Sequence, residues 1–195
     1  MDPFGDHALS CASLGSYTRH NDLKKRFADV CQDIGLEVET EVGPLDSSRR
    51  PADVKVYGLD PSEPVAVDFA FAHVLQPSCN LAAVRAGKLA AEVERRKNRE
   101  NTAICRQAGF KARAFVVETL GAWGGGARFL VQRLVRLWAQ KFGVSVREAG
   151  LHVHGVLGST VVKAVCRQLE RGFPAPGCAA GMGERDGVGG LNWAF

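Results

Sequence analysis

The sequence of 195 residues lacks the patterns that mark several classes of protein. No run of about 18 apolar residues occurs, so we expect no membrane-spanning helix. The first seven residues carry neither a cationic start nor a hydrophobic stretch, so we expect no secretory signal there. No internal repeat is visible, and the length suits one domain with a core of its own, with or without tails.

Cysteine is present without the spacing of a disulfide framework or of a zinc site. No CxxC pair occurs among the six cysteines, which are Cys11, Cys31, Cys79, Cys105, Cys166 and Cys178. Cys31 and Cys105 fall in helical patterns, where we expect them to be small buried apolar residues. Free, scattered cysteines favour a reducing, intracellular setting.

Charge of neither sign dominates the whole chain, whose formal net charge is +4, with 46% hydrophobic and 24% charged residues. The local balance is more informative. Between Arg85 and Arg113, nine basic residues stand against three acidic ones, an excess of six that is larger than the net charge of the chain. Such an excess suits the phosphate backbone of a nucleic acid, although a solvated helix has the same composition.

Two short segments predict a β-hairpin. Residues 50–57 and 64–71 are rich in β-branched and aromatic residues, and the Gly- and Pro-containing residues 58–63 separate them. Pairing Val54 with Val67 brings the apolar residues of both strands to one face, and a shift of one residue destroys this match.

The same register sets Asp53 opposite Asp68. Side chains directly opposed on antiparallel strands have Cβ atoms roughly 5 Å apart, and like charges at that distance destabilise the pair. Two facing carboxylates therefore predict a bound cation, and Mg²⁺ typically takes one or two carboxylates plus substrate phosphates. The alternative is that Asp53 lies in water at a strand entrance and that Asp68 faces solvent.

The remaining patterns predict an α/β fold, with helices on both sides of a mixed sheet. Helical spacing from Thr18 to Ile34 ends at Gly35, and an alternating strand follows at Leu36–Val42. The further elements expected are a long helix at about Asn80–Gln107 closed by Gly109, a buried strand at Phe110–Thr119, a Gly-rich turn at Leu120–Gly126 with Trp123, and helices at Ala127–Phe142 and Ser145–Arg171.

Lys97 has an unexpected position for a charged residue. The i+3/i+4 walk along the apolar stripe of its helix passes through Lys97, so its side chain points toward the sheet. It either reaches the two aspartates or forms a surface pair with Glu100. Lys55, two residues after Asp53, competes for the aspartates. His20, also on an inward stripe, is either structural or part of the site.

These residues together resemble the restriction-enzyme-like endonuclease domains of site-specific non-LTR retrotransposons, a branch of the PD-(D/E)xK nuclease superfamily. The resemblance extends over about Asp2–Trp123. It rests on Arg19-His20-Asn21 opening a helix, Pro51-Ala52-Asp53, Asp68 after fourteen intervening residues, and Glu94-Arg95-Arg96-Lys97 in the following helix. Two positions depart from the superfamily pattern: Ala70 stands where the usual lysine is found, and Ala52 separates Pro51 from Asp53.

The resemblance implies a restriction-endonuclease-like αβββαβ core followed by C-terminal helices. It implies an endonuclease-like domain at residues 16–171 and a remnant of a zinc-knuckle-like segment at 1–15. Residues 172–195 are rich in Gly, Pro and Ala, so we expect a disordered tail there. His7 and Cys11 match the second half of that knuckle, and we do not expect them to hold zinc, because a structural site needs four ligands. No reverse-transcriptase sequence is present, so the chain resembles a stand-alone or truncated relative.

The function implied is that of a DNA endonuclease that depends on Mg²⁺ or Mn²⁺, works without a small-molecule cofactor and resides in the nucleus. Asp53 and Asp68 would hold the metal, and Lys97 and His20 would assist catalysis. The DNA backbone would contact Lys55, Arg95, Arg96 and Arg99.

Two alternatives remain open. One is a catalytically inactive nucleic-acid-binding relic of the same fold. The other is a protein-interaction module built on the helices after Trp123, although their apolar residues are also suited to pack on the sheet as core. Those residues are Phe129, Leu130, Leu134, Leu137 and Trp138.

Overall fold

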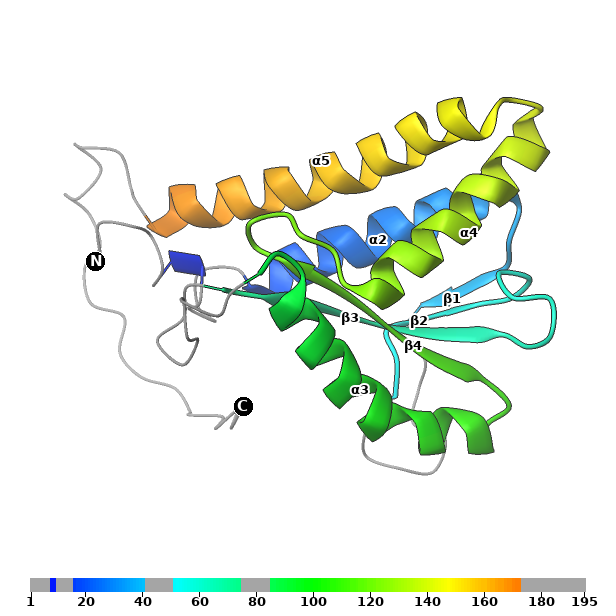
Figure 1. Ribbon diagram of the computed structural model, residues 1–195, viewed down its shortest axis with the longest axis horizontal. Helices are drawn as coiled ribbons and strands as arrows, with labels where there is room; N and C mark the ends of the chain where they lie inside the picture. The colour runs from blue at the N-terminus through cyan, green and yellow to red at the C-terminus, as the bar shows by residue number, and fades with distance from the viewer. Residues whose placement is uncertain (1–7, 10–15, 41–50, 75–84, 173–195) are drawn as a thin grey trace.

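A computed structural model describes residues 8–9, 16–40, 51–74 and 85–172 of the protein. These residues form an α/β fold in the order helix, three strands, helix, strand and two helices (Figure 1). The elements are α2 (Ser16–Ile34), β1 (Val38–Thr40), β2 (Val54–Val56), β3 (Val65–Ala72), α3 (Lys88–Gln107), β4 (Lys111–Glu118), α4 (Gly125–Phe142) and α5 (Val146–Gly172). The predicted fold class is confirmed at this level.

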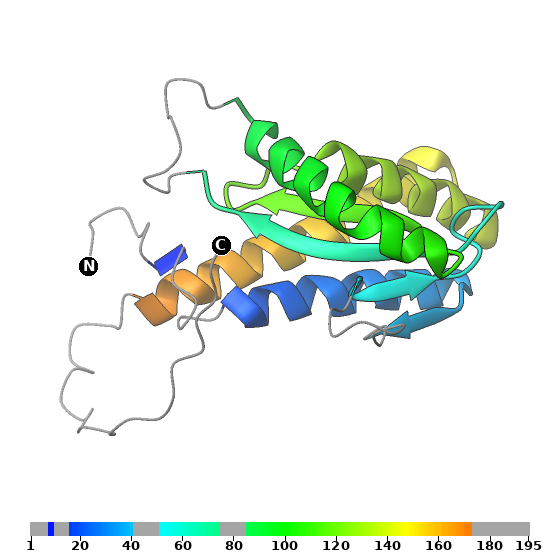
Figure 2. The ribbon, with the colours of Figure 1, turned by 90° about the horizontal axis from the view of Figure 1, so that it is seen from below.

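The four strands form one mixed sheet in the order β1-β2-β3-β4. The pairs β1–β2 and β2–β3 are antiparallel, whereas β3 and β4 are parallel. A parallel pair needs a crossover, and α3 supplies it. Helices α2 and α4 pack on one face of the sheet with α5 outside them, and α3 packs on the other face, as Figures 1 and 2 show from two directions.

The main core lies between the sheet and the helices α2, α4 and α5 on the same side of it. Phe27 of α2, Phe69 of β3 and Phe115 of β4 are buried and meet with ring centroids 5.1 to 5.5 Å apart. Leu130 and Leu134 of α4 belong to the same cluster. The alternative that the apolar residues after Trp123 serve as core is therefore confirmed for these two leucines.

The opposite face of the sheet is covered with smaller side chains. Ala90 of α3 packs with Ala114 and Val116 of β4, and Leu89 and Val93 lie at the margin of this cluster. Small residues on both sides let α3 approach the sheet closely. The polar residues of α3 that point inward consequently come within reach of β3.

Two buried carboxylates close the N-termini of helices that belong to other elements. Glu118, at the end of β4, accepts hydrogen bonds from the backbone N–H groups of Gly87 and Ala90, at 3.0 and 3.1 Å, at the start of α3. Glu94 of α3 accepts bonds from Gly126 and Ala127 at the start of α4. Anions stabilise helix N-termini, so these contacts fix α3 and α4 relative to β4 and to each other.

The predicted boundaries agree with the structure at most ends. Gly35 and Gly109 follow α2 and α3 with φ of 94° and 78°, a backbone conformation in which glycine is favoured. The strand predicted at Leu36–Val42 is shorter, since β1 covers Val38–Thr40 and residues 41–50 lie outside the described residues. The long helix predicted from about Asn80 begins later than expected, since α3 starts at Lys88 and residues 85–87 are not helical. Residues 80–84, His7 and Cys11 of the knuckle, and the tail after Gly172 lie outside the described residues.

Helix α5 is long and apolar enough to cross a membrane by length and composition alone. Core helices pass the same test. One stripe of α5, formed by Val153, Leu157 and Val161, is buried in the main core, while Leu151 and Val162 are exposed. The expectation that the chain has no membrane span therefore stays a prediction.

Candidate functional site

The hairpin register brings the two predicted acids together. Val54 pairs with Val67 and Val56 with Val65, as the sequence predicts. The backbone N–H of Asp53 donates to the Val67 carbonyl over 3.0 Å, so the residue just before β2 is also bonded to β3. Asp53 thus lies beside the strand that carries Asp68. The Asp53 carboxylate is near enough to Asp68 to raise the pKa of that group.

Asp68 is held from the α3 side of the sheet. The ammonium of Lys97 donates to both carboxylate oxygens, at 2.9 and 2.8 Å, and the Asn101 amide donates to one of them at 2.8 Å. The predicted inward direction of Lys97 is confirmed by this contact with Asp68. The Lys97 and Asp68 side chains are 23% and 18% exposed, so the pair lies at a partly open surface.

Asp53 is held from the α2 side. Its Oδ2 lies 3.0 Å from His20 Nε2 and accepts a hydrogen bond from the Phe69 backbone N–H at 2.8 Å. The His20 ring meets Phe69 edge-on, with centroids 6.3 Å apart, and its Nδ1 lies 3.5 Å from the Asn21 side-chain oxygen. The acid pair thus receives partners from helices on both faces of the sheet.

The pKa values of the two acids are shifted in opposite directions. Burial raises the pKa of Asp68, the Lys97 ammonium opposes the rise, and the neighbouring Asp53 adds to it, so the pKa stays above its ordinary 3.8. For Asp53, burial acts upward, but the hydrogen bond and charge of His20 outweigh it and lower the pKa. Carboxyl groups whose pKa values are driven apart are suited to different chemical roles.

His20 has a raised pKa. Burial alone acts to lower the pKa of an imidazole, but the hydrogen bond to Asp53 and the charge of that carboxylate raise it above 6.5. A protonated ring donates from both nitrogens, which agrees with oxygen atoms facing Nδ1 and Nε2. The contact with Asp53 therefore favours the protonated form of His20.

The donor set fits a hard divalent cation that shares its coordination with water and substrate. No group of three or more His, Cys, Asp and Glu side chains suited to hold a metal occurs in the described ranges. Asp53 and Asp68 alone are enough for Mg²⁺, which usually keeps several waters and takes one or two protein carboxylates. The raised pKa of Asp68 shows that a negative charge there is costly, and a divalent cation would relieve that cost.

Lys55, the competing candidate, lies away from the acid pair. Its side chain is buried, its ammonium donates to Glu39 at 3.1 Å, and it stands over the ring of Phe110 at 4.0 Å from the centroid. The neighbouring Tyr57 ring is 4.5 Å away. A buried, paired ammonium of this kind is poorly available to a DNA backbone.

The three predicted DNA-contacting arginines, Arg95, Arg96 and Arg99, are all exposed on α3. Arg95 and Arg99 line an open hollow with Glu92 and Asn98. Asn98 also lines a tight cavity that holds Asp68 and Lys97. The basic side of α3 is therefore next to the acid pair.

Sequence reasoning missed the roles of Asn98 and Asn101. Asn101 holds Asp68 directly, and the Asn98 side-chain oxygen accepts the backbone N–H of Ala114 in β4 at 3.0 Å. The inward line of α3 runs through Ala90, Glu94, Lys97, Asn101 and Cys105, with i+3 or i+4 steps throughout. Reading this line for polar as well as apolar residues would have found Asn101.

Arg19, the first residue of the Arg-His-Asn segment, is a structural residue here. Its guanidinium is buried, stacks over Phe71 with 4.5 Å to the ring centroid, and lies 3.4 Å from the Leu9 carbonyl. Burial lowers its pKa to about 10. Arg19 thus anchors the start of α2, which in turn sets the position of His20.

No model of a known protein family matches the chain, and no curated protein matches its sequence. The chemistry of the acid pair is accordingly argued from its own geometry.

Proposed function

We propose that the protein is a divalent-metal-dependent DNA endonuclease that nicks its target by hydrolysing a phosphodiester bond. The observation that carries the proposal is the convergence of Asp53 and Asp68 with Lys97 from one helix layer and His20 from the other. Two carboxylates, an ammonium and an imidazole around one partly open point suit phosphoryl-group hydrolysis. The order of the elements is compatible with a restriction-endonuclease-like core, which is part of the same proposal.

The roles follow from charge and from pKa. Asp53 and Asp68 would hold the cation, which when bound supplies polarisation of the scissile phosphate and a more acidic water. The Lys97 ammonium, which contacts Asp68, would stabilise negative charge that develops on the phosphate oxygens. His20 has a raised pKa, so it is suited to donate a proton to the leaving oxygen, while the proton of the attacking water would pass to solvent.

Support for a nucleic-acid substrate comes from the arginines beside the acid pair. Exposed Arg95, Arg96 and Arg99 on α3 offer charges that a phosphate backbone can contact without base readout. A retrotransposon origin for the domain rests on the Arg-His-Asn, Pro-Ala-Asp and Glu-Arg-Arg-Lys segments alone, and it remains part of the proposal.

The test is nicking of supercoiled plasmid DNA by the purified chain with Mg²⁺ or Mn²⁺. Asp53→Asn and Asp68→Asn should abolish nicking, and Lys97→Met should reduce it by about 10²-fold, the size of effect typical of one electrostatic stabiliser. Glu63→Gln, in the exposed loop of the same hairpin, removes one carboxylate and should nick as the wild type does. Circular dichroism and a thermal melt would show that each variant folds.

The outcome that contradicts the proposal is equal cleavage by the wild type and both acid variants, or no cleavage by any of them with either metal. A nucleic-acid-binding relic is the second candidate, and one observation favours it. Lys97 engages both oxygens of Asp68, so that carboxylate is already compensated without a metal. Metal-independent binding of DNA together with an absence of nicking would identify this alternative.

A further inference from the structure

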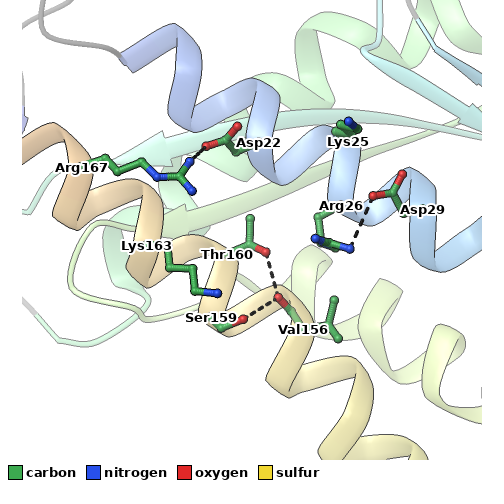
Figure 3. Close-up of a pocket in the computed structure, with 9 residues that line it drawn as sticks. All are labelled: Asp22, Lys25, Arg26, Asp29, Val156, Ser159, Thr160, Lys163 and Arg167. Atoms are coloured by element: carbon green, nitrogen blue, oxygen red, sulfur yellow. Dashed lines mark hydrogen bonds and ion pairs between the residues drawn. The ribbon is translucent and has the colours of Figure 1, made fainter.

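A second hollow in the surface lies between α2 and α5 (Figure 3). It has a volume of about 430 Å³. The helices that form it are more than 110 residues apart in sequence and pack against each other on the same side of the sheet, as Figures 1 and 3 show. We call it the α2–α5 groove, and its charged lining residues are Asp22, Lys25, Arg26, Asp29, Lys163 and Arg167.

Each acid in the groove is already paired with an arginine. Arg167 of α5 reaches across to Asp22 of α2 at 2.8 Å, and Arg26 lies 3.6 Å from Asp29 on the same helix. These pairs neutralise both carboxylates. They also hold the two guanidinium groups in the walls of the groove, as Figure 3 shows.

Lys25 and Lys163 have no such partner. Neither makes a hydrogen bond or ion pair with any residue in the part of the chain that the structure describes. One comes from each wall, so the groove carries two uncompensated positive charges. The hydroxyls of Ser159 and Thr160 line the same wall as Lys163 and at present donate to the Val156 carbonyl. Ammonium and hydroxyl groups of this kind are ligands for phosphate oxygens.

We propose that the α2–α5 groove binds the phosphodiester backbone of a nucleic acid, as a contact separate from the site of cleavage. Two features favour this occupant. The groove runs between two long helices, which suits an extended polyanion, and the lysines supply point charges without an aromatic or amide group for base readout. The contact is therefore predicted to be independent of base sequence and sensitive to salt.

The groove is separate from the acid pair because it uses another side of α2. Asp22, Lys25, Arg26 and Asp29 follow i, i+3, i+4 and i+7 spacing and so share one face of the helix. His20 lies off that face and points to Asp53. Binding in the groove thus requires neither the metal nor the two catalytic acids.

The experiment compares two double variants of equal charge. Lys25→Gln with Lys163→Gln removes the uncompensated charges of the groove, and Arg136→Gln with Arg147→Gln removes two exposed charges elsewhere on α4 and α5. Binding to a fluorescent DNA duplex of mixed sequence is measured in a chelator, so that no cleavage occurs, over a range of salt concentrations. The logarithm of the DNA-binding constant falls with the logarithm of the salt concentration, and each phosphate contact steepens this slope by about 0.9. Losing the contacts of both lysines should therefore make the slope about 1.8 less steep.

A difference of that size means that the wild type loses about 12-fold more affinity than the groove variant between roughly 50 and 200 mM salt. The control variant should follow the wild type. The inference is overturned if the groove and control variants have the same salt slope. Binding to poly-glutamate, a polyanion without phosphate, is measured in the same way, and the inference is also overturned if the groove variant loses binding to poly-glutamate but not to DNA. Absence of any DNA binding at low salt would also overturn it. Because the assay contains no metal, a failure to nick DNA affects only the proposed endonuclease activity.

Discussion

Gly126, at the start of α4, provides a test of how closely α4 packs against β4 and against Glu94 of α3, the helix that carries Lys97. A Cβ atom at Gly126 would lie 2.5 Å from the Ala114 carbonyl oxygen of β4 and 3.2 Å from a carboxylate oxygen of Glu94. The carbonyl belongs to the sheet backbone and cannot move cheaply. Gly126→Ala therefore requires α4 to move away from β4.

The expected loss has two sources. Forcing an extra methyl group into a packed interior costs about 1–3 kcal/mol. The movement also weakens the hydrogen bonds from the Gly126 and Ala127 N–H groups to the buried Glu94 carboxylate, and a bond to a charged group contributes about 1.5–3 kcal/mol. Since replacing a helical glycine by alanine returns about 0.5–1 kcal/mol, we expect a net destabilisation of about 2–4 kcal/mol.

Gly125→Ala is the matched control. A Cβ atom there meets Glu94 at 3.7 Å, an ordinary contact, so this variant should be unchanged or up to about 1 kcal/mol more stable. Urea titration followed by circular dichroism gives both free energies of unfolding. At about 2–4 °C per kcal/mol for a domain of this size, Gly126→Ala should melt roughly 4–16 °C lower. Equal stability of the two variants would refute the close packing of α4 on β4 and Glu94.

Three further predictions concern the acid pair and its surroundings. The raised pKa of His20 and the lowered pKa of Asp53 mean that their contact stabilises the folded protein most between about pH 4 and 6.5. The difference in free energy of unfolding between the wild type and His20→Gln should therefore shrink as the pH rises to about 9. Mn²⁺ should stabilise the wild type against heat by about 2.7 kcal/mol at 100 times its Kd and leave Asp68→Asn unchanged. In DNA binding, Arg99→Gln should reduce the salt slope by about 0.9 and Lys55→Met should not, which fluorescence anisotropy would measure.

Several features of the fold follow from short-range sequence patterns. The hairpin register could be predicted because side chains alternate with period two, so the valines of both strands match in one alignment only. The inward direction of Lys97 followed from helical periodicity in the same way. Gly35 and Gly109 ended helices because each takes a left-handed conformation.

The identity of partners from distant segments depended on the tertiary structure. Lys55 lies two residues after Asp53, yet its ammonium contacts Glu39 and the ring of Phe110. Glu94 and Glu118 looked like ordinary charged residues in the sequence, and only the packing of α3, β4 and α4 turned them into anions at helix N-termini.

The sequence alone thus determined which faces of its helices and strands turn inward, and it indicated that two acids lie close together. The tertiary structure decided that His20 reaches Asp53 across 33 residues and that α2 and α5 form a basic groove. The physical reason is one of range. Periodicity records whether a side chain faces the core, whereas the partner it meets depends on chain closure over tens of residues, which no local pattern encodes.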